Sequence, residues 1–190
     1  MISGIRASVA VLLICWSAVA GASDWGLSEL GEALGNATEG RVGFREERTV
    51  AYLSSPLVST GYVARHGDRI EKHVVAPKRE SLILDGANME VESEDGWQSY
   101  DVDDHPMLRG LSAALQAGLT GRFGPAEDVF DIALKGDRDG WSIFLSPKPG
   151  AVAEAVEEIV LQGADDRIET IDIRSTDGDR STMTLLHDDE

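Results

Sequence analysis

The chain has 190 residues, and its 34 Asp and Glu outnumber its 17 Lys and Arg, which gives a formal net charge of −17. Such acidity argues against nucleic acid or an anionic membrane surface as a partner, because both would repel the protein. The only cysteine is Cys15, inside a segment that we expect to be removed. Composition therefore excludes structural disulfides, a thiol nucleophile and cysteine metal ligands from the mature chain, which must be stabilised by a hydrophobic core.

Residues 1–22 have the pattern of a cleaved secretory signal peptide. Arg6 supplies the positive charge, residues 9–16 form an apolar run, and residues 18–22 contain two small-x-small cleavage patterns. The apolar run is shorter than the roughly 20 residues that a membrane-spanning helix needs. We expect residues 23–190 to fold as one monomeric domain outside the cytoplasm, with only transient membrane contact.

An amphipathic helix is predicted at the start of the mature chain, within residues 24–39. Gly40 is suited to end it. The apolar positions recur at helical spacing, and they are Leu27, Leu30, Leu34 and Ala37.

A meander of antiparallel strands is predicted next. Turn signals occur at nearly regular spacing, and Asp85-Gly86 and Asp95-Gly96 are the strongest, because Asp-Gly tolerates the positive φ of a tight hairpin. The first long strand has Val42, Phe44, Val50 and Tyr52 in one phase. Further strands are predicted at 57–65, 69–76, 80–84, 88–93 and 97–102.

A second helix interrupts the strands at 106–119. Asp104-His105-Pro106 supplies its start, and its apolar face consists of Leu108, Leu111, Leu115 and Leu119. The strand pattern then resumes at 129–135, 141–147, 158–163, 167–174 and 181–186. About ten or eleven strands with two helices indicate a mainly β chain of the α+β class, a curved sheet or open barrel with a helix over its open side.

The concave face of such a sheet is suited to an apolar ligand. Sequestering an acyl chain removes apolar surface from water at about 0.8 kcal/mol per methylene, so the cavity needs only apolar lining. The alternative, that the same side chains form an ordinary packed core, stays open at this point. The candidate lining residues are Phe44, Val63, Ile70, Leu82, Leu84, Met89, Ile143 and Leu145 on strands, and Leu111 and Leu115 on the second helix.

Common catalytic and metal-binding motifs are absent from the sequence. It contains no Gly-x-Ser-x-Gly, Ser-x-x-Lys, His-Glu-x-x-His or Walker pattern. The four histidines are scattered, with His73 alone on a strand, and the acidic group at 101–105 lacks EF-hand spacing and fits a helix cap. We therefore expect a binding protein without cofactor or metal, and not an enzyme.

Four short segments follow one another in a recognisable order: Phe44-Arg45-Glu46, Ser59-x-Gly61-Tyr62, and the stretches 82–86 and 141–147. Behind a signal peptide and around a helix, they resemble the LolA-like periplasmic carriers of outer-membrane lipoproteins. The resemblance implies an incomplete antiparallel barrel wrapped around a helical lid, with an apolar cavity for acyl chains. It also implies an inner-membrane exporter that loads the carrier and an outer-membrane acceptor that unloads it.

The sequence departs from these carriers near the start of the third strand. The best-understood members have an arginine, a proline and an aromatic residue there, whereas this chain has Arg65-His66-Gly67-Asp68-Arg69-Ile70. Arg65 or His66 is thus the candidate transfer-site residue, and a divergent member with another lipid-like cargo is indicated. Two alternatives remain: a periplasmic module that senses lipid or lipoprotein, and a lipid-modifying enzyme using residues such as Asp101 and His105.

Overall fold

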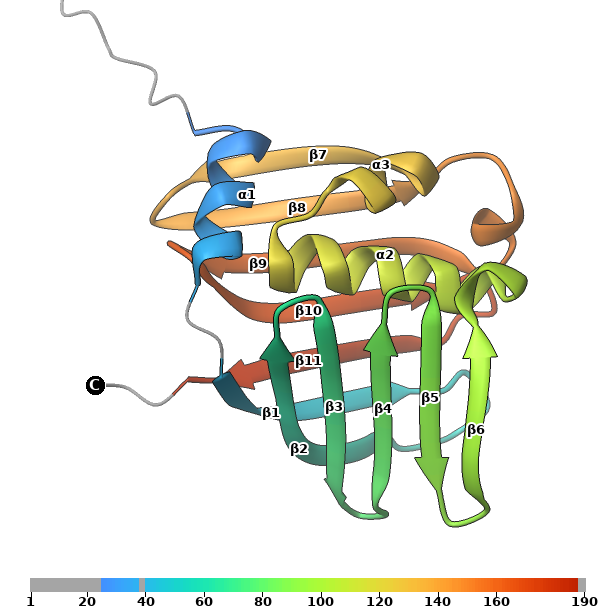
Figure 1. The fold of residues 1–190 in the computed structure, drawn as a ribbon. Helices are drawn as coiled ribbons and strands as arrows, with labels where there is room; N and C mark the ends of the chain where they lie inside the picture. The colour runs from blue at the N-terminus through green and yellow to red at the C-terminus, as the bar shows by residue number, and fades with distance from the viewer. Residues whose placement is uncertain (1–24, 38–39, 188–190) are drawn as a thin grey trace, which may run out of the picture.

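The computed structural model describes residues 25–37 and 40–187, and the predicted signal peptide, 1–22, lies outside them. The described part forms one curved antiparallel sheet with helices on its concave side (Figure 1). The strands are β1 (Gly40–Thr49), β2 (Leu57–His66), β3 (Arg69–Ala76), β4 (Glu80–Asp85), β5 (Asn88–Ser93), β6 (Gly96–Asp101), β7 (Phe130–Asp137), β8 (Gly140–Pro147), β9 (Val156–Ala164), β10 (Arg167–Ser175) and β11 (Arg180–Leu186).

Two meanders meet in the middle of this sheet. The order of the 11 strands is β6-β5-β4-β3-β2-β1-β11-β10-β9-β8-β7, so the first and last strands of the described chain are neighbours. They pair antiparallel in a register that sets Phe44 opposite Leu185. Strands β6 and β7 are the two edges of the sheet, which is therefore open. An open antiparallel sheet with helical segments confirms the expected fold class.

The chain has to travel from edge strand β6 to the opposite edge strand β7, and helices make this crossing. The 3₁₀ helix η1 (Val102–Asp104), α2 (Pro106–Thr120) and α3 (Gly124–Val129) follow one another there. Figure 1 shows α2 lying across the concave side of the sheet. The other helices are α1 (Leu27–Asn36) and η2 (Ala151–Glu154). Two helices were expected; α3, η1 and η2 are too short to show helical periodicity in the sequence.

Helix α2 packs closely on one half of the sheet through its small residues. A Cβ atom on Gly118 would lie 2.7 Å from Ile168 Cδ1 and 3.0 Å from Leu161 Cδ1, and one on Gly110 would lie 2.9 Å from Val152 Cγ1. Ala113, Ala114 and Ala117 are buried as well. The small side chains therefore bring the helix against β9, β10 and η2, while its leucines remain available to face the other half of the sheet.

The first long strand ends earlier than its apolar phase predicts. Strand β1 stops at Thr49, Val50 is buried, and Tyr52 is exposed in the connection to β2. Apolar alternation continues in the sequence beyond the last strand residue, which is why the pattern predicts a longer strand.

Gly61 is required where β2 and β3 approach each other. The register of this pair shifts between Thr60 and Gly61, and a Cβ atom at Gly61 would lie 1.9 Å from the carbonyl oxygen of His73. The His73 backbone is held in a paired strand, so it cannot move away from an added methyl group as a flexible side chain can. The close approach therefore needs a residue without a side chain.

We predict that Gly61→Ala lowers the free energy of unfolding by about 2–3 kcal/mol, because the added methyl forces apart two paired strands. Gly43 on the neighbouring strand is the matched control, since a Cβ atom there would have Leu186 Cβ as its nearest neighbour at 3.6 Å. Gly43→Ala should leave stability within about 0.5 kcal/mol of wild type or raise it. Urea unfolding measures the stability of both variants. Equal losses of unfolding free energy would contradict the requirement for glycine at position 61.

Candidate functional site

Two adjoining cavities lie between α2 and the concave face of the sheet. The first, here called the central cavity, has a volume of about 230 Å³ and lies between α2 and strands β1, β2, β3, β4, β10 and β11. The second, here called the end cavity, has a volume of about 350 Å³ and lies where α1 and the last turn of α2 meet the start of β1 and the end of β11. Val63, Leu119 and Leu185 line both, so the two cavities share a wall.

The central cavity is apolar along most of its length and polar at one end. Its apolar lining consists of Val63, Ile70, Leu82, Met107, Leu111, Leu115, Leu119, Ile171, Ile173, Met183 and Leu185. The polar end, near the start of α2, is lined by Glu46, Arg48, Lys72, Ser175, Asp179, Arg180 and Ser181. Strand alternation produces this gradient: on β3 Ile70 is followed by Lys72 on the same face, and on β11 Leu185 and Met183 are preceded by Ser181.

A carboxylate from β1 organises the polar end. Glu46 Oε2 accepts a hydrogen bond from Lys72 Nζ at 2.6 Å, and its Oε1 accepts one from Ser181 Oγ at 2.6 Å. Burial by itself would raise the pKa of Glu46, but the charge of Lys72 and hydrogen bonds from Lys72, Ser181 and Ser59 outweigh it and hold the pKa below its ordinary value. Four strands thus meet at one ionised side chain.

This cluster predicts a specific acid response. Because the pKa of Glu46 is lower in the folded chain than in the unfolded one, its contribution to stability is present above the ordinary pKa of 4.5 and is lost as the pH falls through the folded value. Glu46→Gln should therefore flatten the fall in unfolding free energy below about pH 4.5. Urea titrations of wild type and variant at successive pH values measure this pH dependence of the unfolding free energy.

The variant Lys72→Met tests whether Lys72 lowers the pKa of Glu46. Without the cation, only the hydrogen bonds from Ser181 and Ser59 oppose the effect of burial, so the pKa of Glu46 should rise from its wild-type value, and the loss of stability below about pH 4.5 should become smaller. An acid profile identical to that of wild type would contradict the role given to Lys72.

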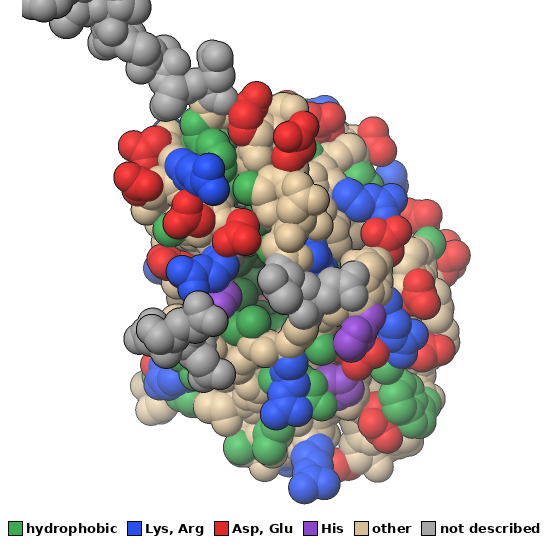
Figure 2. All heavy atoms as spheres, turned by 60° about the vertical axis from the view of Figure 1, so that its left-hand side comes forward, with side chains coloured by type: hydrophobic (Ala, Val, Ile, Leu, Met, Phe, Trp, Pro, Cys, Tyr) green, Lys and Arg blue, Asp and Glu red, His purple; other side chains and the backbone are tan. Residues whose placement is uncertain are grey.

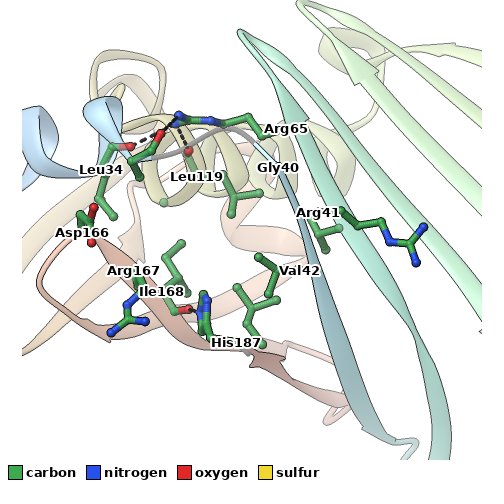
Figure 3. A pocket seen from close by; sticks show the side chains of 14 residues that line it. Leu34, Gly40, Arg41, Val42, Arg65, Leu119, Asp166, Arg167, Ile168 and His187 are labelled. Carbon is green, nitrogen blue, oxygen red and sulfur yellow. Dashed lines mark hydrogen bonds between the residues drawn. The ribbon is translucent and has the colours of Figure 1, made fainter. Parts of the chain in front are cut away.

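Arg65 on β2 fastens the ends of two helices at the end cavity (Figure 3). Its Nη1 donates hydrogen bonds to the carbonyl oxygens of Leu34 (3.0 Å) and Leu119 (2.6 Å), and its Nη2 donates to that of Ala37 (2.5 Å). These carbonyls belong to the C-terminal ends of α1 and α2, which lack helical donors and carry the negative end of the helix dipole. One guanidinium therefore joins both helices to the sheet.

We predict that Arg65→Met destabilises the protein by on the order of 3 kcal/mol, because it leaves the helix-end carbonyls without their charged donor. Arg65→Lys should recover only part of this, since a single ammonium group lacks the planar fork of donors. Arg45→Met is the control, because Arg45 forms only an exposed ion pair with Glu47. Hydrogen exchange should show faster opening of α1 in the Met variant, and unchanged protection there would contradict the fastening role.

The structure places the ten predicted cavity residues in two groups. Val63, Ile70, Leu82, Leu111 and Leu115 line the central cavity. Phe44, Leu84, Met89, Ile143 and Leu145 line neither cavity and are at most 1% exposed within the core. Of the two candidate transfer residues, Arg65 lines the end cavity, whereas His66 is exposed at the end of β2.

The C-terminal strands also form cavity walls, which the sequence pattern did not predict. Ile171 and Ile173 on β10 and Met183 and Leu185 on β11 line the central cavity. Their alternation was visible in the sequence, but the pairing of β11 with β1 that brings them to the same place is a long-range feature. Leu119, which the sequence places on the apolar face of the second helix, lines both cavities.

The side of the molecule that carries α1 faces the viewer in Figure 2. Hydrophobic side chains are visible there in a hollow, between basic and acidic side chains. Arg41, Asp166, Arg167 and His187 line the end cavity, and in Figure 3 the side chain of Arg41 points away from it.

Polar groups outside the two cavities are engaged in local contacts. His73 bridges neighbouring side chains on the sheet, with Nε2 2.9 Å from Glu71 Oε2 and Nδ1 3.0 Å from Ser81 Oγ. Asp101 caps η1 by accepting a hydrogen bond from the Asp103 backbone N–H. Within 25–37 and 40–187, no group of three His, Cys, Asp or Glu side chains is arranged to hold a metal ion.

None of the helices in the described ranges is long and apolar enough to span a membrane.

Comparison with known proteins gives one family match. A model of the family described as outer membrane lipoprotein carrier protein LolA-like matches residues 17–188. No curated protein matches the chain. Among solved structures, a LolA superfamily protein, NE2245 from Nitrosomonas europaea, aligns at 10% identity and a TM-score of 0.47, over 86% of this chain and 93% of that one. A DUF1329 family protein from Desulfovibrio piger aligns at 10% identity and a TM-score of 0.41, over 85% and 90%.

Proposed function

Because this chain belongs to the family of LolA-like outer membrane lipoprotein carrier proteins, we propose that it is a periplasmic carrier of acyl chains. The cargo is a lipoprotein or another lipid, received from an inner-membrane exporter and passed to an outer-membrane acceptor. The observation that carries this proposal is the central cavity, an apolar space beneath α2 that adjoins a second one.

Apolar burial supplies the affinity. Each methylene moved from water into the cavity contributes about 0.8 kcal/mol, so part of one acyl chain suffices for useful binding without any polar recognition. The end cavity, at about 350 Å³, is within the roughly 300–1,000 Å³ range of small-ligand sites, and the central cavity, at about 230 Å³, lies just below it. Since they share a wall, a shift of Leu119 would join them into one longer space.

The two sides of α2 have different roles in this proposal. Its small residues hold it against β9 and β10, and its leucines form the movable wall. Arg65 holds the C-terminal ends of α1 and α2 together over the end cavity. Entry of a long chain requires these contacts to loosen, and their reformation expels the chain at the acceptor.

We expect the purified protein to bind a fluorescent fatty-acyl probe. Leu111→Trp, which fills the central cavity, should weaken binding about tenfold, the equivalent of roughly two fewer buried methylenes. Leu108→Trp is the matched control, since Leu108 lies on the same helix but outside both cavities. Fluorescence titration measures affinity, and circular dichroism verifies folding. Equal binding by wild type and a folded Leu111→Trp variant would contradict the proposed site.

A further inference from the structure

The connection between β1 and β2, together with the first two residues of β2, exposes apolar side chains that do not pack into the core. Tyr52 is 87% exposed, and Leu53, Leu57 and Val58 are 41–53% exposed. These are four of the eight large hydrophobic side chains that are exposed in the described part of the chain. We call residues 51–58 the apolar loop.

Charge is absent from this loop and from its surroundings in the sequence. Residues 49–64 contain no Asp, Glu, Lys or Arg, although 27% of all residues in the chain are charged. In so acidic a protein, an uncharged apolar segment would ordinarily be buried, as residues 110–120 of α2 largely are. An exposed one marks a surface that meets something apolar.

The apolar loop is fixed beside the polar end of the central cavity. The Ala51 backbone N–H donates a hydrogen bond to Asp179 Oδ1 at 3.0 Å, and Asp179 also pairs with Arg48 at 3.4 Å. Asp179 and Arg48 both line the central cavity, and so does Met107 at the start of α2, which is 36% exposed. The loop therefore projects next to an opening of the cavity.

We propose that the apolar loop docks the protein on a lipid bilayer and sets this opening against the membrane surface. Tyr with Leu and Val, accompanied by Ser54 and Ser55, is a composition suited to the boundary between headgroups and acyl chains. The purpose given to this contact, passage of a chain between bilayer and cavity, rests on the proposed function. The contact itself does not.

The lipid surface should be electrically neutral. A net charge of −17 opposes approach to anionic lipid, whereas apolar insertion into a zwitterionic surface meets no such barrier. The cationic residues at this opening do not change the sign, because Arg48, Lys72 and Arg180 pair with Asp179, Glu46 and Asp172 respectively.

Cosedimentation with protein-free phosphatidylcholine vesicles tests the proposal. We expect wild type to bind and the double variant Tyr52→Ser/Leu53→Ser to bind at least about tenfold more weakly, because the substitutions remove much of the inserted apolar area. Added phosphatidylglycerol should weaken binding of wild type. The control Trp97→Ser removes a large side chain, 56% exposed on β6, and should bind as wild type does.

Uptake of the fatty-acyl probe in vesicle-free solution separates this proposal from the carrier function, since the double variant should retain it in full. The docking role would be overturned if the double variant bound vesicles as well as wild type does. It would also be overturned if wild type did not bind them. Loop-dependent binding only to membranes that still contain their proteins would also overturn it, in favour of a protein partner.

Discussion

The pairing of β1 with β11 is the constraint on which the rest of the structure depends. It joins two meanders, each formed by local hairpins, into one sheet whose outer strands are β6 and β7. Because β6 and β7 are consecutive strands at opposite edges, the chain between them has to travel from one edge to the other, and it does so over the concave side. Helix α2 is part of this crossing and covers the sheet, and the cavities lie where the helix and the sheet do not touch.

The residues of α2 decide on which side that space forms. Glycine and alanine allow the helix backbone to approach β9, β10 and η2, and the leucines hold the other half of the sheet at a distance. A helix with large residues all round would fill the interior or be displaced from the sheet. Gly110 and Gly118 consequently serve close packing in this protein.

Polar groups then divide the concave face into regions. Arg65 satisfies helix-end carbonyls beside the end cavity, and the Glu46 cluster joins four strands at the opposite end. The guanidinium of Arg65 donates to three carbonyl oxygens, and the carboxylate of Glu46 is paired with Lys72, so both charges are hydrogen-bonded within the protein. The apolar loop lies outside these networks, which is why its exposed side chains are free to take part in an intermolecular contact.

The sequence by itself determined the strands, the turns between them and the amphipathic helix after Pro106, since these follow from alternation, Asp-Gly hairpins and helical spacing within short windows. It also identified Arg65 as a candidate, through resemblance. Only the tertiary structure decided that Leu84, Met89 and Ile143 are core while Ile171 and Met183 line a cavity. Alternation tells which face a side chain occupies, whereas a cavity wall depends on what packs against that face, and here this is set by the long-range β1–β11 register and the small residues of α2.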